Sequence, residues 1–80
     1  MFINNAKDGK NNLCGVKIAK KRKKLGISQR ELADRLQLIG LDVDKNAIQR
    51  IECGKRFVTD IELKALSETL KITVSDLLSL

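Results

Sequence analysis

Residues 44–56 read DKNAIQRIECGKR, and the spacing of their apolar residues predicts a helix with two unlike faces. Successive residues of an α-helix are rotated by about 100°, so Ala47, Ile48 and Ile51 share one arc. The opposite arc carries Lys45, Asn46, Gln49 and Arg50. The first face suits a hydrophobic core. The second is either the solvated surface that every amphipathic helix has or a surface that reads a partner.

The length and composition of the chain favour one small all-α domain. A chain of 80 residues can enclose one modest core and is too short for two. Proline is absent and aromatic residues make up only 2% of the chain, whereas the helix formers Leu, Lys, Glu and Ala are abundant. Strands therefore have little support, and we expect helices throughout.

The chain is basic, and its charge is unevenly distributed. Lys and Arg number 16 against 10 Asp and Glu, which gives a net charge of +6. Residues 14–27 contain basic residues and no acid, whereas residues 58–80 are net acidic. A surplus of this size indicates an anionic partner, but it does not choose between nucleic acid, a membrane surface and an acidic protein.

Capping signals define the first two predicted helices. Apolar residues at helical spacing predict a helix over residues 13–25, which ends because Gly26 readily takes the left-handed conformation. Ser28 and Glu31 have the spacing of a capping box and start a second helix. This helix is expected to run to Gly40, with an apolar face made of Leu32, Ala33, Leu36 and Ile39.

Three more helices follow. Asp44 is placed to cap a third, which runs to Glu52 or Cys53 and ends at Gly54. Two further capping-box patterns open a fourth and a fifth helix: Thr59 with Glu62, and Thr73 with Asp76. Their predicted apolar stripes are Ile61, Leu63, Leu66 and Leu70 in the fourth, and Val74, Leu77, Leu78 and Leu80 in the fifth.

The sequence offers no metal centre and no catalytic centre. Cys14 and Cys53 form no CxxC pair and the chain has no histidine, so we expect both cysteines to be reduced and to act as small apolar residues. With no Gly-rich phosphate loop and no base for either thiol, we expect a non-enzyme without cofactor or small-molecule ligand. No apolar run reaches the ~18 residues of a membrane span and no signal peptide opens the chain, so a cytoplasmic protein is expected.

Three stretches of the chain, taken in order, resemble one known family. GISQRELADRL (26–36), NAIQRIECGKR (46–56) and LKALSETLKITVSDLL (63–78) are similar to the helix-turn-helix family of the phage lambda and 434 repressors and Cro, the Xre family. The matching motif positions are Ser28, Gln29, Leu32, Ala33, Ile48, Glu52, Gly54 and Lys55. The resemblance covers about 14–80 and implies a compact five-helix bundle of the lambda-repressor-like DNA-binding type.

The resemblance assigns a role to the polar face described first. It implies that residues 45–53 form a recognition helix in the DNA major groove. The implied base-contacting residues are Lys45, Asn46, Gln49 and Arg50, whose side chains suit adenine and guanine edges. The implied phosphate-contacting residues are Ser28, Gln29, Lys55 and Arg56, which would fix register without reading sequence. A solvated surface stays the alternative for both sets, and is favoured for the lysines of residues 17–24.

The resemblance also implies a partly buried salt bridge between Arg22 and Glu52. The alternative is a surface pair worth less than about 1 kcal/mol.

One departure from the family pattern concerns the connection between the second and third helices. LQLIGLDVD (36–44) adds several residues before the cap at Asp44, so this connection is lengthened. Either the second helix runs longer, or Leu41 and Val43 pack a loop. The added residues also put in question whether Gln29 can still reach a backbone phosphate and the recognition helix.

These inferences together predict a sequence-specific double-stranded DNA-binding transcriptional regulator. We expect a weak homodimer through the C-terminal helix and its leucines Leu78 and Leu80, on half-sites roughly one helical turn apart. Residues 1–12 are assigned to a flexible tail ahead of a domain at 13–80, with an arm that grips the DNA backbone as the alternative.

Two other functions compete with DNA binding. The stronger is a protein-interaction module, of the anti-regulator or antitoxin kind, that uses the same fold without DNA readout. Salt separates the two, because DNA binding weakens steeply as salt rises. A membrane-surface role for KIAKKRKKL (17–25) has little support, since this segment lacks Trp or Phe to enter lipid.

Overall fold

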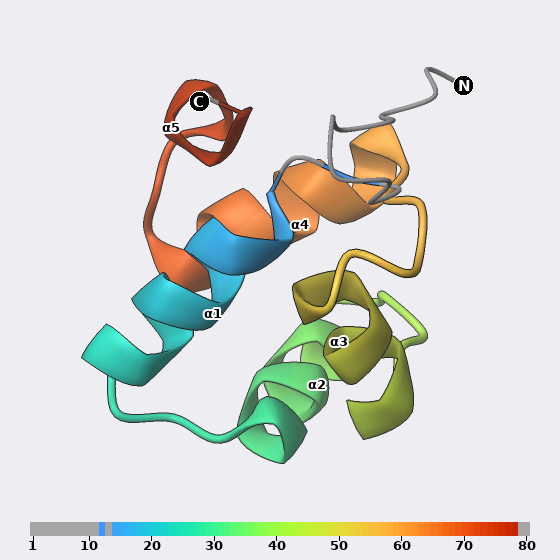
Figure 1. Ribbon diagram of the computed structural model, residues 1–80. Coiled ribbons are helices and arrows are strands. Elements are labelled where there is room, and N and C mark those ends of the chain that lie inside the picture. Colours follow the sequence, from blue (N-terminus) through green and yellow to red (C-terminus); the bar gives the residue numbers. More distant parts are fainter. Residues whose placement is uncertain (1–11, 13, 79–80) are drawn as a thin grey trace.

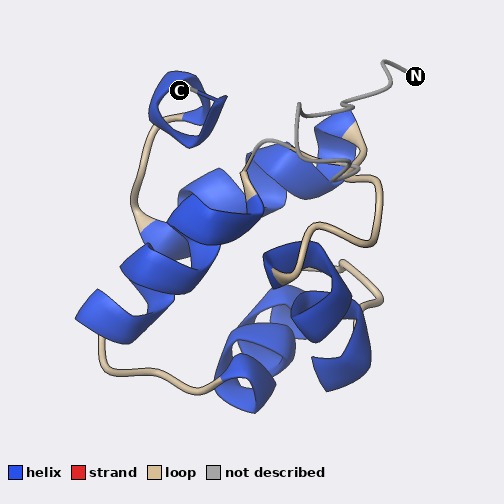
Figure 2. Ribbon diagram, viewed as in Figure 1, coloured by secondary structure: helices blue, strands red, loops and turns tan. Residues whose placement is uncertain are grey.

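The computed structural model describes Asn12 and residues 14–78, and that part of the chain contains five helices and no strand (Figures 1 and 2). Their bounds are α1 Gly15–Lys24, α2 Gln29–Leu38, α3 Lys45–Glu52, α4 Asp60–Leu70 and α5 Val74–Leu78. α3 contacts both α1 and α2, and α4 contacts α1, α2 and α5. The predicted all-α five-helix bundle is confirmed.

The polar caps that the sequence predicts are present at the helix starts. The Ser28 hydroxyl accepts a hydrogen bond from the Glu31 amide at 3.0 Å, and the Asp44 carboxylate accepts one from the Ala47 amide at 2.8 Å. The capping box at Ser28 is only half formed, because the Glu31 carboxylate pairs with Arg35 at 2.7 Å instead of returning to the cap. These caps fix where α2 and α3 begin.

Thr59 and Glu62 complete the capping box that opens α4. The Thr59 hydroxyl accepts a hydrogen bond from the Glu62 amide at 3.2 Å, and the Glu62 carboxylate accepts one from the Thr59 amide at 3.0 Å. At the start of α5, the Asp76 amide donates to the Thr73 hydroxyl at 3.0 Å. Both starts are therefore where the sequence placed them.

Left-handed residues follow the first four helices, α1 to α4. After α3, Gly54 has φ 78°, its amide donates to the Ile51 carbonyl at 3.0 Å, and the Lys55 amide donates to the Arg50 carbonyl at 2.8 Å. This pair of hydrogen bonds is the Schellman motif, which satisfies carbonyls that a helix end leaves open. Lys71 takes the left-handed position after α4 with φ 57°, although it carries a side chain.

The core lies where the inner faces of the helices meet. Its buried apolar residues are Cys14, Ile18, Ile27, Leu32, Ala33, Leu36, Val43, Ile48, Ile51, Val58, Leu66, Leu70 and Leu77. Ile48 and Ile51 belong to this core and are the predicted inner face of α3. Burying that face fixes the rotation of α3 about its axis, and so fixes which side chains point outward.

Two residues predicted for apolar faces are exposed. Ile39 is 54% exposed because α2 ends at Leu38, so Ile39 caps the helix instead of extending its inner face. Ile61 is 73% exposed because the buried face of α4 is made of Glu62, Leu66 and Leu70. Glu62, whose carboxylate is paired with Arg56, thus occupies the buried position that Ile61 was expected to fill.

The connection between α2 and α3, residues 39–44, is a packed loop and does not extend α2. Val43 is buried, Leu41 packs against the core, and the Gln37 side-chain amide donates to the Val43 carbonyl at 2.7 Å. Apolar packing and a hydrogen bond to the backbone therefore hold this loop in place. α3 begins directly after it, at the cap residue Asp44.

Asn12 belongs to the folded domain, although the sequence placed it at the end of a flexible tail. It is 2% exposed, and its side chain forms hydrogen bonds with the backbone of Gly15, Ile51 and Arg56. The rest of the predicted tail, residues 1–11, lies outside the described residues. None of the helices in the part of the chain that the structure describes is long and apolar enough to cross a membrane.

Candidate nucleic-acid interface

α3 exposes the whole polar face that the sequence predicts. All four predicted base-contacting residues are exposed, namely Lys45, Asn46, Gln49 and Arg50. Behind them Ile48 is 0% and Ile51 1% exposed, so the same helix is anchored in the core. The two-faced pattern in residues 44–56 therefore corresponds to a rigidly held helix with an open polar surface.

Arg22 and Glu52 form an ion pair beneath this surface. Arg22 Nε lies 2.7 Å from Glu52 Oε2 and Arg22 Nη2 lies 3.0 Å from Glu52 Oε1, while Nη1 donates to the Ile27 carbonyl at 3.0 Å. The two side chains are only 11% and 7% exposed, so this is a buried pair and not a surface one. The hydrogen bonds that Arg22 donates to Glu52 raise the pKa of the guanidinium, against the lowering effect of burial.

Gln29, in the first turn of α2, joins this cluster. Its Nε2 donates to Glu52 Oε1 at 3.0 Å, so Glu52 ties the end of α3 to α1 and to the start of α2 at once. Gln29 therefore reaches the end of α3, and it is half-buried. Ser28 is exposed, and its hydroxyl oxygen is used in the cap of α2.

Lys55 and Arg56, which follow α3, have different surroundings. Lys55 is exposed. The Arg56 guanidinium donates to both Glu62 carboxylate oxygens, at 2.9 and 2.8 Å. These hydrogen bonds raise the pKa of Arg56, although its burial acts in the opposite direction. The structure thus ties Arg56 to α4, which the sequence did not predict because Glu62 was already explained as part of a capping box.

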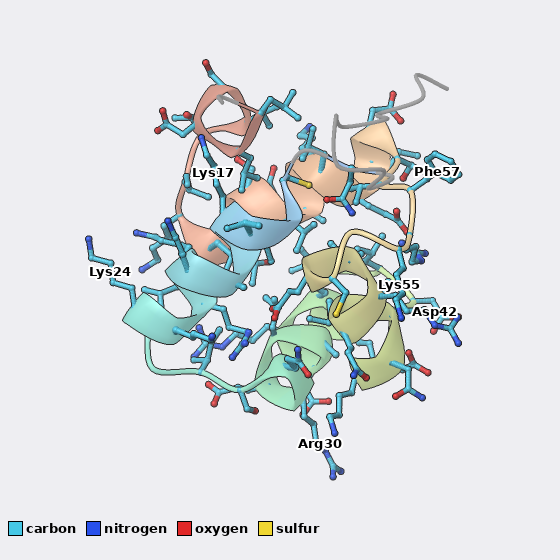
Figure 3. All side chains as sticks on the ribbon, in the orientation of Figure 1. Lys17, Lys24, Arg30, Asp42, Lys55 and Phe57 are labelled. Atoms are coloured by element: carbon cyan, nitrogen blue, oxygen red, sulfur yellow. The ribbon has the colours of Figure 1, made fainter. Side chains whose placement is uncertain are left out.

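Arg30 is a cation at this surface that the sequence reasoning missed. It is exposed in the first turn of α2, next to Gln29. In Figure 3 its side chain extends outward beyond the ends of α2 and α3. A basic residue directly after the Ser28–Gln29 pair was the available signal.

The lysines of α1 occupy a different part of the surface. The Lys17 ammonium donates to the Asp76 carbonyl of α5 at 3.0 Å, and Lys24 projects from the far end of α1 in Figure 3, away from Lys55. Lys20 and Lys23 are exposed like Lys24, whereas Lys17 is half-buried, so the solvated face favoured for these lysines stays a prediction.

The two cysteines differ, and the apolar role predicted for Cys53 is wrong. Cys14 is buried in the core, and burial raises the pKa of its thiol to about 11. Cys53 is exposed because it caps the end of α3 instead of facing inward. In the described part of the chain, no cluster of His, Cys, Asp or Glu could hold a metal ion.

An exposed helix, anchored by a buried ion pair and braced by the preceding helix, defines a helix-turn-helix domain. Residues 18–77 match the model of the Helix-turn-helix family, and the chain belongs to this Xre-like, lambda-repressor-like family of DNA-binding transcription regulators. The predicted family is therefore confirmed.

Solved structures give the same result. The P22 c2 repressor protein, crystallised with a synthetic operator, is 31% identical, with a TM-score of 0.73 over 85% of this chain and 96% of that one. The restriction-modification controller protein C.AhdI from Aeromonas hydrophila is 25% identical, with a TM-score of 0.69 over 79% and 88%. The clp gene regulator ClgR from C. glutamicum shares the fold, at 24% identity and a TM-score of 0.71 over 82% and 79%. The comparison with curated proteins gives no match.

Proposed function

We propose that this chain is a sequence-specific regulator of transcription that inserts α3 into the major groove of double-stranded DNA. The observation that carries the proposal is the open face of Lys45, Asn46, Gln49 and Arg50 on a helix whose other face is buried. The 31% identity to a repressor that was crystallised with its operator supports the same role.

The side chains of α3 suit direct readout of base edges. Asn46 and Gln49 can each pair with adenine through two hydrogen bonds, whereas Lys45 and Arg50 can donate to the acceptors of guanine. Each good pair contributes on the order of 1–3 kcal/mol of discrimination against the wrong base. The buried ion pair below keeps the helix from rotating, which preserves the spacing of these four groups.

The phosphate contacts would come from the start of α2 and from the loop after α3. The N-terminus of α2 carries a partial positive charge, so Ser28, Gln29 and Arg30 are placed to meet a phosphate there. Lys55, which follows α3, would contact a second phosphate. Arg56 would have to leave Glu62 to do the same, so we assign it to holding the loop rather than to direct contact.

The quaternary arrangement in this proposal is a weak homodimer through α5, on a two-fold operator. Leu78 is half-buried and is available only in part, and Leu80 lies outside the described residues. Half-sites about one helical turn apart would let both copies of α3 reach the same side of the DNA.

The experiment that tests the proposal is selection of bound sequences from a random duplex pool. The wild-type chain should enrich one motif, and Arg50→Ala and Gln49→Ala should each relax the preference at one position. Lys64→Ala, which removes an exposed cation from α4, is the matched control and should recover the wild-type motif.

Two results would contradict the proposal in different ways. If no motif is enriched and binding to duplex hardly changes with salt, the protein-interaction reading replaces DNA readout. If both α3 variants recover the motif unchanged, the assignment of the recognition helix is wrong.

A further inference from the structure

One buried amide side chain joins three separate parts of the fold. Asn12 Oδ1 accepts a hydrogen bond from the Gly15 amide at 2.8 Å, at the start of α1. Asn12 Nδ2 donates to the Ile51 carbonyl at 3.0 Å and to the Arg56 carbonyl at 2.8 Å. Asn12 precedes the segment that matches the family model, so the family pattern assigns it no role.

The carbonyls that Asn12 binds lie on either side of the loop after α3. Ile51 is in the last turn of α3, and its carbonyl also accepts a hydrogen bond from the Gly54 amide at 3.0 Å. Arg56 lies between α3 and α4, where no helix supplies a donor for its carbonyl. A single Nδ2 group therefore sets the separation between the end of α3 and the residue that follows Lys55.

The fit of α1 against this junction leaves little freedom. A Cβ added at Gly15 would collide with the Ile51 carbonyl oxygen, so the start of α1 lies directly against the end of α3. Asn12 is 2% exposed, so its hydrogen bonds form away from competing water. The junction is thus rigid and specific to the amide side chain.

We propose that Asn12 is a positioning residue for phosphate binding, acting through Lys55. The backbone amide of Lys55 donates to the Arg50 carbonyl at 2.8 Å, which fixes the chain just before the Lys55 side chain. On the other side, the carbonyl of Arg56 is held by Asn12 and its guanidinium by Glu62. Asn12 thereby keeps the Lys55 ammonium in register with α3. This inference rests on the proposed DNA-binding function.

The direct test is Asn12→Asp in the full chain. Aspartate keeps the shape and can still accept from the Gly15 amide, but it places a carboxylate oxygen against two carbonyl oxygens. Asn12→Ala is the second variant, because it removes both donors without adding a charge. Lys64→Ala lowers the net charge by the same amount at an exposed position of α4 and controls for it.

The measurement is the dissociation constant for the selected duplex over a series of salt concentrations, below the unfolding midpoint of each variant. Log affinity falls as log salt rises, and losing one phosphate contact makes this slope shallower by about 0.9. Lys55→Ala should show that reduction, and so should Asn12→Asp and Asn12→Ala. The double variants with Lys55→Ala should bind no more weakly than the Asn12 variants alone, because coupled sites are not additive. Lys64→Ala should keep the wild-type slope.

The outcomes separate this inference from the proposed function. If wild type binds the duplex and a folded Asn12 variant keeps the wild-type slope, Asn12 only stabilises the fold and the positioning role is refuted. Additive losses for Asn12 and Lys55 would refute the route through Lys55. If wild type does not bind duplex, the proposed function fails and the positioning role fails with it.

Discussion

Replacing Glu52 with alanine should destabilise the protein far more than the loss of a surface charge. Glu52 accepts hydrogen bonds from Arg22 at 2.7 and 3.0 Å and from Gln29 at 3.0 Å. In Glu52→Ala, Arg22 keeps only the Ile27 carbonyl as a partner, although its side chain is just 11% exposed. A buried guanidinium without its carboxylate costs roughly 3–5 kcal/mol.

That loss is large for a domain of this size. Small domains have free energies of unfolding of about 0.05–0.15 kcal/mol per residue, so a chain of 80 residues has on the order of 4–12 kcal/mol in total. Since 1 kcal/mol shifts Tm by about 4–8 °C in such domains, Glu52→Ala should lower Tm by at least about 12 °C. Urea unfolding followed by circular dichroism at 222 nm would measure the free energy directly.

The pair of Glu31 and Arg35 is the matched control. Its N–O distance of 2.7 Å equals that of the buried pair, but its side chains are 48% and 46% exposed. Arg35→Ala should therefore cost no more than about 0.5 kcal/mol. The double variant Arg22→Met with Glu52→Met should recover most of the loss, because no buried charge is stranded. A loss for Glu52→Ala as small as that for Arg35→Ala would refute the reasoning.

Three other predictions follow from the same structure. Burial acts to raise the pKa of Glu62, but hydrogen bonds from Arg56 and Thr59, together with the positive charge of Arg56, outweigh it and lower the pKa. The stabilisation is then complete above the ordinary Glu pKa of about 4.3 and is lost as pH falls through the lower folded value. Urea midpoints of wild type should fall more steeply between pH 5 and pH 3 than those of Glu62→Gln, and parallel curves would contradict this. A disulfide reagent at pH 8 should titrate Cys53 in the native protein and Cys14 only after unfolding; fast reaction of both would show that Cys14 is not shielded. Lys71→Gly should raise the free energy of unfolding by about 0.5–1 kcal/mol, because glycine adopts the left-handed conformation without the strain of a Cβ; a lower urea midpoint would be the contrary result.

Much of the candidate interface could be predicted because it depends on local geometry. The outward direction of Gln49 and Arg50 follows from the rotation per residue once Ile48 and Ile51 are known to be buried. The position of α3 along the chain follows from a cap and a left-handed glycine, each of which forms its hydrogen bonds within a few residues.

The errors came from contacts between residues whose pairing no local pattern reveals. Ile61 was assigned to the core because apolar residues usually are, but Glu62 is buried there with Arg56 as its partner. The pairing of Arg56 with Glu62 was likewise not predicted, because the resemblance assigned Arg56 to phosphate. A charged residue can be buried only where a counterion or hydrogen-bond partner meets it, and the local sequence pattern did not show that partner.

The sequence by itself determined the five helices, the polar caps at the starts of α2 to α5 and the polar face of α3, since hydrogen bonds within one helical turn and the pitch of the helix decide all of these. Only the tertiary structure decided that Asn12 belongs to the domain, because its partners Ile51 and Arg56 are 39 and 44 positions away. It likewise decided that Arg22 and Arg56 are held by carboxylates. Those pairings depend on how the helices pack against one another, which the pattern within any one helix does not encode.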